Sequence, residues 1–108
     1  MQETEAARLK KVLGERIKYF RKKQGLSQTQ LAEIVNIEMK SLSRIESGHN
    51  YPQCENLVAI ARALKVAPWQ LYFNEGEKDL ESMRQEVINA LDDKEKIFPL
   101  YQYLAYLR

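Results

Sequence analysis

The chain has 108 residues, of which 44% are hydrophobic and 30% are charged, and its net charge is +2. This composition suits a folded protein of one domain, or one domain with an appendage, and excludes wholesale disorder. The longest apolar run, residues 57–64, contains Arg62 and is far shorter than the ~20 residues of a membrane helix, and the polar N-terminus lacks the apolar core of a secretory signal.

Residue types that carry redox or metal chemistry are scarce. The single cysteine, Cys54, cannot form an internal disulfide, and together with one histidine it cannot make a zinc site. We therefore expect a cytoplasmic protein without a metal or cofactor. Residues 1–26 carry eight Lys/Arg and three acids, whereas residues 76–108 carry five and seven. A basic N-terminal end suits an anionic partner, although it also suits a solubilising surface.

Apolar residues repeat at spacings of three and four without period-2 alternation, which predicts an all-α fold. A first helix is expected over about 4–24, ended by a basic last turn and Gly25. Its apolar residues are Leu9, Val12, Leu13, Ile17 and Phe20. Ser27 and Gln30 have capping-box spacing and begin a second helix over about 28–35, which Asn36 ends in the left-handed conformation. Its apolar residues are Leu31, Ile34 and Val35.

A third helix is expected over 39–47, stopped by Gly48, and a fourth over about 53–64. Their apolar residues are Leu42, Ile45, Leu57, Ile60, Ala61 and Leu64, with Ile37 just before the third helix. Pro68 suits the first position of a short fifth helix. Three aromatic residues are expected to close the core, namely Trp69, Tyr72 and Phe73. Cys54 is expected to be a half-buried packing residue.

The chain after residue 75 is expected to form a C-terminal extension of two helices. The polar stretch 74–78 is a linker, a helix spans about 79–91, and Asp92 and Glu95 have capping-box spacing for the last helix, in which Pro99 implies a kink or a restart. The two predicted domains are thus 1–75 and 76–108. The apolar residues of the extension exceed what a five-helix core needs, so we expect it to dimerise. The predicted dimer interface is Met83, Val87, Leu91, Phe98, Tyr101 and Leu104.

The two helices 28–35 and 39–47, joined by a short turn, have the layout of a helix-turn-helix. Leu31, Ala32 and Asn36 at their spacing, with RKKQGLSQ before and RIESG after, resemble the lambda-repressor-like family of bacterial and phage regulators, the Cro/repressor (XRE) type. The resemblance covers about residues 9–73. It implies a five-helix DNA-binding domain whose helix 39–47 lies in the major groove.

The resemblance also implies roles for single residues. Gln28 matches a glutamine that in relatives contacts a phosphate and supports the recognition helix. Arg21 and Glu46 match a partly buried salt bridge between the first and third helices. The chain departs from the common pattern at Asn36 and Lys65, where relatives usually have glycine, and at Glu38, where they have serine or threonine. We exclude Glu38 from the phosphate contacts because its charge would lie near the DNA backbone.

Five polar or flexible residues form one strip along helix 39–47, namely Met39, Lys40, Ser43, Arg44 and Ser47. From periodicity alone this strip would be a solvated surface with Met39 packed into a local gap. If the resemblance holds for function, the first four are the predicted base contacts. Arg44 could donate two hydrogen bonds to a guanine, Lys40 could do likewise or hold a phosphate, and Met39 could pack against a thymine methyl. The predicted backbone contacts are Gln28, Thr29, Ser47, His49, Asn50 and Lys23.

The sequence therefore predicts a regulator of transcription that binds double-stranded DNA sequence-specifically, most simply as a repressor. One short recognition helix spans few base pairs, so we expect a homodimer on a pseudo-palindromic operator. An alternative is an antitoxin-type or other interaction module that holds a partner protein through residues 77–108. An enzyme is not predicted, because the chain has no Gly-rich phosphate loop and no nucleophile-and-base arrangement.

Overall fold

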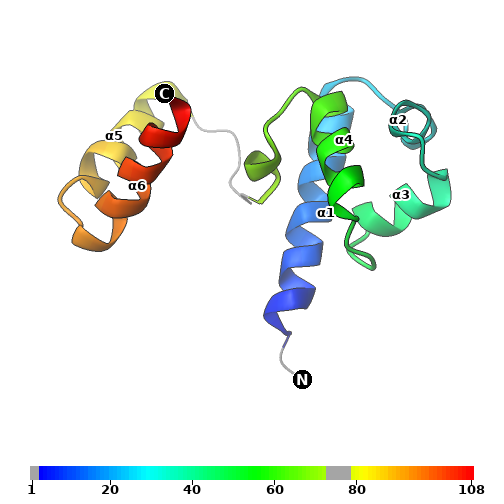
Figure 1. The fold of residues 1–108 in the computed structure, drawn as a ribbon, viewed down its shortest axis with the longest axis horizontal. Helices are drawn as coiled ribbons and strands as arrows, with labels where there is room; N and C mark the ends of the chain where they lie inside the picture. Colours follow the sequence, from blue (N-terminus) through cyan, green and yellow to red (C-terminus); the bar gives the residue numbers. More distant parts are fainter. Residues whose placement is uncertain (1–2, 73–78) are drawn as a thin grey trace. The chain divides into compact units, whose positions relative to one another are not determined.

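The computed structural model describes residues 3–72 and 79–108. Over these ranges the chain is helical and contains no strand, which confirms the predicted all-α fold class (Figure 1). It divides into two compact units, Met1–Asn74 and Glu75–Arg108. The predicted linker 74–78 and Phe73 lie outside the described residues. In the part of the chain that is described, every helix is too short or too polar to cross a membrane.

The first unit contains four α-helices and one 3-10 helix. These are α1 (Glu5–Lys23), α2 (Gln28–Val35), α3 (Met39–Glu46), α4 (Cys54–Leu64) and the 3-10 helix η1 (Pro68–Tyr72). Each bound lies within one residue of the sequence-based prediction, because the capping and stop residues that end these helices are local signals.

The helix ends are set by side-chain caps and left-handed residues. The Thr4 hydroxyl accepts the Ala7 N–H at 3.0 Å at the start of α1. The predicted capping box is present at α2: the Gln30 N–H donates to Ser27 Oγ at 3.0 Å, and the Ser27 N–H donates to Gln30 Oε1 at 2.8 Å. Asn36 ends α2 in the left-handed conformation with φ 58°. The predicted start and end of the second helix are thereby confirmed.

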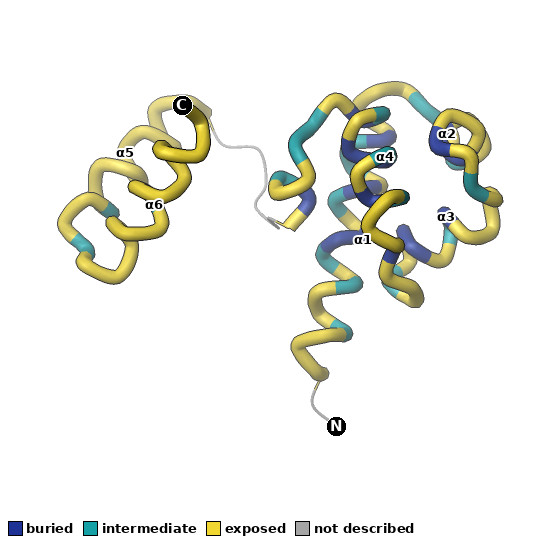
Figure 2. The backbone as a smooth tube through the Cα atoms, viewed as in Figure 1, coloured by how far each residue is buried: buried dark blue, intermediate teal, exposed yellow. Residues whose placement is uncertain are grey.

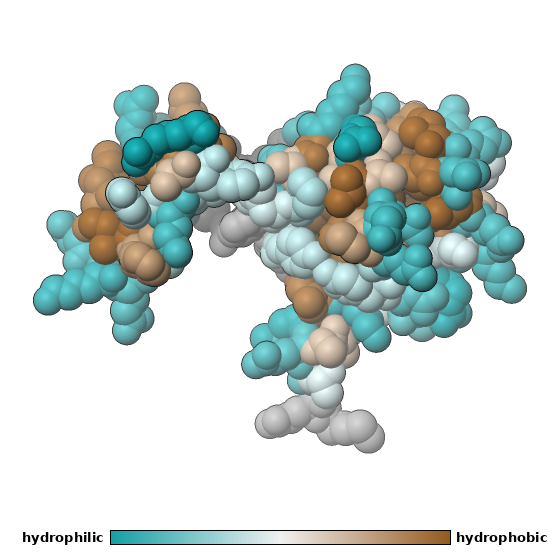
Figure 3. Space-filling model, in the orientation of Figure 1, coloured by the Kyte–Doolittle hydropathy of each residue, from teal (hydrophilic) through white to brown (hydrophobic). Residues whose placement is uncertain are grey.

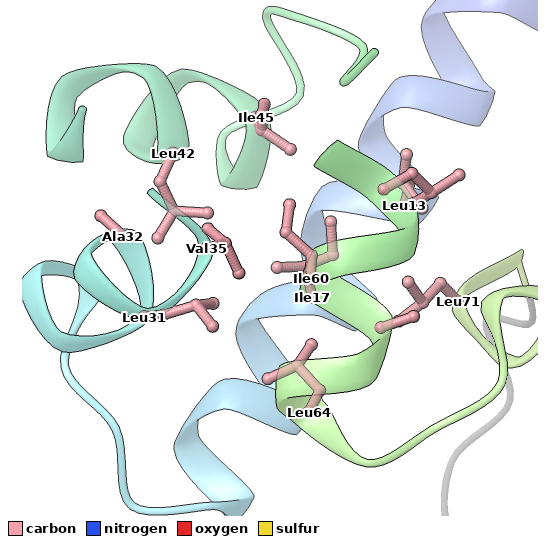
Figure 4. Packing of buried hydrophobic residues seen from close by; sticks show 12 residues of the cluster. Leu13, Ile17, Leu31, Ala32, Val35, Leu42, Ile45, Ile60, Leu64 and Leu71 are labelled. Carbon is pink, nitrogen blue, oxygen red and sulfur yellow. The ribbon is translucent and has the colours of Figure 1, made fainter. Parts of the chain in front are cut away.

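The core of the first unit is a single apolar cluster between the helices (Figures 2 and 4). Its fully buried large side chains are Leu13, Ile17, Leu31, Leu42, Ile60, Leu64 and Leu71. Every helix of the unit contributes to this set, and Figure 4 shows their side chains converging between α1, α2 and α4. The core therefore fixes α2 and α3 against α1 and α4.

Several predicted core residues are not covered. Leu9 and Ile34 are exposed, because they lie on faces of α1 and α2 that no neighbouring helix reaches. Leu71 closes the core in place of Trp69 and Tyr72, which are both more than a third exposed. The tighter turn of a 3-10 helix changes which residues of η1 face inward.

The expected burial of Cys54 is also wrong, since this cysteine is exposed at the start of α4. The apolar face of α4 begins instead at Leu57 and continues through Ile60, Ala61 and Leu64. Cys54 is the first residue of the helix and precedes this face by almost a full turn.

The second unit consists of α5 (Leu80–Ala90) and α6 (Lys94–Leu107). Asp79 caps α5 by accepting the Ser82 N–H at 2.7 Å, and this bond lowers the pKa of the Asp79 carboxyl. Asp93 caps α6 by accepting the Glu95 N–H at 2.9 Å, so the predicted cap at Asp92 is wrong by one residue. The helix continues through Pro99 without the restart that its proline suggested.

Neither α5 nor α6 contains a buried residue (Figure 2). The six predicted interface residues are all exposed, with fractions between 47% for Met83 and 63% for Phe98. Figure 3 shows apolar side chains at the surface of this unit. The two helices therefore leave much of their apolar surface exposed.

Candidate DNA-binding surface

Helix α3 is fixed to the domain along one face. Leu42 is fully buried and Ile45 nearly so, while Ile37, just before the helix, packs against the same core. The turn between α2 and α3 is held by the Ile37 N–H, which donates to the Ala32 carbonyl at 3.0 Å. These contacts set the orientation of α3 relative to α2, as a helix-turn-helix requires.

The opposite face of α3 points away from the core. Met39, Lys40 and Arg44 are exposed and Ser43 is partly buried; these four residues are called the outward face of α3. Met39 is 47% exposed, so it does not fill a gap in the packing. The outward face thus presents two cations, a hydroxyl and a flexible thioether, which are groups that hydrogen-bond or pack against base edges.

A buried ion pair holds the C-terminal end of α3 to α1. Arg21 Nε donates to Glu46 Oε2 at 2.7 Å and Arg21 Nη2 donates to Glu46 Oε1 at 3.0 Å. The two side chains are 8% and 2% exposed. Arg21 Nη1 also donates to the Leu26 carbonyl at 2.8 Å, so one guanidinium links α1, the chain before α2 and α3. This is the pair that the family resemblance implies.

Gln28 extends the same network to the start of α2. Its Nε2 donates to Glu46 Oε1 at 3.0 Å. The supporting role implied for Gln28 therefore has a definite partner, the carboxylate at the end of α3. Thr29 is exposed beside it in the first turn of α2, where backbone N–H groups and the helix dipole favour an anion.

Sequence reasoning missed Gly14, which lies in the middle of α1 and is buried. A Cβ atom at this position would lie 2.4 Å from the Ile45 carbonyl oxygen and 2.6 Å from that of Glu46. Only a hydrogen side chain allows α1 to approach the last turn of α3 this closely. The available signal was a glycine within a strong helical pattern. Because glycine is a poor helix former, its presence there usually indicates close packing.

The loop after α3 folds back onto the end of the helix. The Arg44 carbonyl accepts the Ser47 hydroxyl at 3.1 Å and the backbone N–H groups of His49 and Asn50 at 3.0 and 3.2 Å. Ser47 Oγ also lies 2.7 Å from His49 Nδ1. The predicted contact residues Ser47, His49 and Asn50 are thus held next to Arg44.

The same loop is tied to η1 through two tyrosines. The Tyr51 hydroxyl forms a hydrogen bond with the Tyr72 hydroxyl. Burial, and then this bond, raise the pKa of Tyr72 to about 12. Tyr72 therefore keeps its proton to a higher pH than an ordinary tyrosine does.

Lys23, the remaining predicted backbone contact, lies in the last turn of α1, with its ammonium group 5.7 Å from the centroid of the Tyr19 ring. Glu38 caps α3 without a side-chain hydrogen bond, so its charge interacts with the helix N-terminus through the dipole alone.

The chain is similar in sequence to known helix-turn-helix proteins. A family model described as helix-turn-helix matches residues 17–68. The HTH-type transcriptional regulator DicA of Escherichia coli K12 is 34% identical over 84 residues, which are 77% of this chain and 61% of DicA. The transcriptional repressor RstR of a Vibrio cholerae cryptic phage is 33% identical over 85 residues, covering 76% of this chain and 75% of RstR.

A solved structure of a DNA-binding domain is similar to this chain in fold. The DNA-binding domain of the P22 C2 repressor superposes with a TM-score of 0.57 at 31% identity, covering 62% of this chain and 90% of that domain. The chain spans about three fifths of the length of DicA and three quarters of that of RstR. The matched region contains the Arg21–Glu46 network, α2, α3 and the following loop. The chain belongs to the lambda-repressor-like helix-turn-helix family of transcriptional regulators.

Proposed function

We propose that this protein is a sequence-specific regulator of transcription, acting as a repressor, which binds double-stranded DNA with α3 in the major groove. The observation that carries the proposal is the outward face of α3, held at its C-terminal end by the Arg21–Glu46–Gln28 network. A helix that is to compare base edges needs a fixed angle to the domain, and this network with Leu42 and Ile45 provides it. The relatives named above are a transcriptional regulator and a transcriptional repressor.

In this proposal Arg44, Lys40, Met39 and Ser43 contact bases. Arg44 can donate two parallel hydrogen bonds to O6 and N7 of a guanine, and Met39 can pack on a thymine methyl. Gln28, Thr29, Ser47, His49 and Lys23 are proposed to contact the DNA backbone, which sets the register of the helix without reading sequence.

Arg44→Ala tests the base contacts. After selection of a preferred site from a random DNA pool, we expect this variant to bind that site roughly 5- to 150-fold more weakly than the wild type, the range for one lost bidentate base contact. Binding to scrambled DNA should change much less. Arg62→Ala, which removes an exposed arginine from α4, is the matched control and should leave the preference unchanged. Equal binding of Arg44→Ala and wild type to every selected site would disprove the assignment.

We further propose that the protein is a homodimer on a pseudo-palindromic operator, with half-sites about 10 bp apart or a multiple of that spacing. One eight-residue recognition helix covers too few base pairs for useful selectivity. Residues 79–108 are proposed to supply the dimer contacts. This proposal is supported by the exposed apolar surface of α5 and α6, since large contiguous apolar surfaces in folded proteins usually mark an interface.

A double substitution, Phe98→Glu with Leu104→Glu, tests the dimer in the full-length chain. We expect light scattering to show a monomer, because burial of two unpaired carboxylates would outweigh the remaining contacts. Gln102→Glu, which adds the same charge to an exposed position of α6, should leave the dimer intact. Deletion of residues 77–108 should also give a monomer. An unchanged dimer after that deletion would place the interface elsewhere.

The same apolar surface would also suit a different protein, as the antitoxin-type alternative requires. A full-length chain that is monomeric alone, and that forms a stoichiometric complex with a protein encoded next to it, would favour this alternative. We propose that the protein acts in the cytoplasm under either function.

A further inference from the structure

The side chain of Asn50 lies against the guanidinium of Arg44. Both ends of its amide are satisfied in one orientation: Oδ1 accepts the Arg44 Nε–H at 3.2 Å, and Nδ2 donates to the His49 carbonyl at 3.0 Å. The Asn50 backbone N–H also donates to the Arg44 carbonyl at 3.2 Å. Asn50 therefore contacts Arg44 at both its backbone and its side chain.

This contact decides which edge of the guanidinium remains available. A guanidinium can present either the pair Nε and Nη or the pair Nη1 and Nη2 to two acceptors. Because the Nε–H is used by Asn50, a bidentate contact from Arg44 must come from the end formed by Nη1 and Nη2. That end matches the two adjacent acceptors of a guanine, O6 and N7.

We propose that Asn50 is a positioning residue that sets the base preference of Arg44, and this rests on the proposed DNA-binding function. It orders the long Arg44 side chain before DNA arrives and directs its Nη1/Nη2 end to a guanine. This role differs from the phosphate contact that the sequence predicts for Asn50, because it is the amide oxygen, bonded to Arg44, that performs it.

Asn50→Ala removes the side-chain bond but keeps the backbone N–H that holds the loop to Arg44. We expect discrimination between guanine and the other bases at the position read by Arg44 to fall roughly two- to tenfold, the contribution of ordering one flexible side chain in advance. Affinity for scrambled DNA and the melting temperature should stay as in the wild type. Asn50→Asp keeps an acceptor for Nε and should retain the discrimination, even if its charge weakens binding to all sequences.

The double variant Arg44→Ala/Asn50→Ala separates a positioning role from an independent contact. If Asn50 acts through Arg44, the double variant should discriminate no less than Arg44→Ala alone. The same test can be made on DNA in which 7-deazaguanine replaces the guanine. Removal of N7 should weaken DNA binding by the wild type more than it weakens DNA binding by Asn50→Ala. Two results would overturn the proposal: unchanged discrimination in Asn50→Ala, whether or not binding to all sequences weakens equally, or additive losses in the double variant. If Arg44→Ala itself has no effect on any sequence, the proposed base contact fails, a different outcome from failure of Asn50 alone.

Discussion

Arg21→Met is expected to lower the free energy of unfolding by about 3 to 5 kcal/mol, the cost of leaving one partner of a buried ion pair without the other. The Glu46 carboxylate would then keep only the Gln28 amide among its hydrogen-bond partners described above, in a site where its side chain is 2% exposed. The Leu26 carbonyl would also lose its guanidinium donor. Urea denaturation followed by circular dichroism measures this change.

Two further variants serve as controls for this result. Lys22→Met changes the neighbouring, exposed cation of α1 and should alter stability by no more than about 0.5 kcal/mol. The double variant Arg21→Met/Glu46→Leu should recover most of the loss, because apolar side chains of similar size can replace a buried pair at little cost. A double variant as unstable as Arg21→Met would mean that the loss of stability comes from altered side-chain packing and not from the unpaired charge of Glu46.

Gly14→Ala is expected to destabilise the first unit by roughly 1 to 3 kcal/mol, although alanine is the better helix former. The new methyl group would lie 2.4 Å from the Ile45 carbonyl oxygen, and backbone cannot yield as a flexible side chain can. Helices α1 and α3 must then separate, which changes the angle of the recognition helix. We therefore expect weaker binding to the selected DNA site at temperatures where the variant is still folded, measured by fluorescence anisotropy.

Glu15→Ala is the matched control for this change, since it puts alanine at the next, exposed position of α1. It should affect neither stability nor DNA binding beyond about 0.5 kcal/mol. A higher melting temperature for Gly14→Ala, as expected for a glycine in an open helix, would show that α1 and α3 are not in close contact at this point.

Signals that act over a few residues predicted the first unit well. The Ser27–Gln30 capping box and the left-handed Asn36 follow from the chemistry of single side chains, so the start and end of α2 could be predicted. The Arg21–Glu46 pair is different, because 25 positions separate its members and either residue alone is an ordinary surface charge. Only the family resemblance brought the two together.

The errors arise where burial depends on a neighbouring element. Periodicity places Ile34 on the apolar side of α2, but it cannot show how far the other helices extend over that side. The same holds for η1, where Trp69 and Tyr72 were expected in the core although the 3-10 geometry turns Leu71 inward. Gly14 has no side chain to count, so its role depends wholly on what approaches it in space.

The burial of the Arg21–Glu46 pair separates the salt dependence of folding from that of DNA binding. Mobile ions screen exposed charges strongly but reach a buried pair poorly, so added salt should leave this link between α1 and α3 intact. DNA binding releases counterions from the phosphates, and its affinity falls steeply as the ionic strength rises. Protein eluted from DNA by salt should therefore still be folded, with α3 at its original angle, and should bind again when the salt is removed.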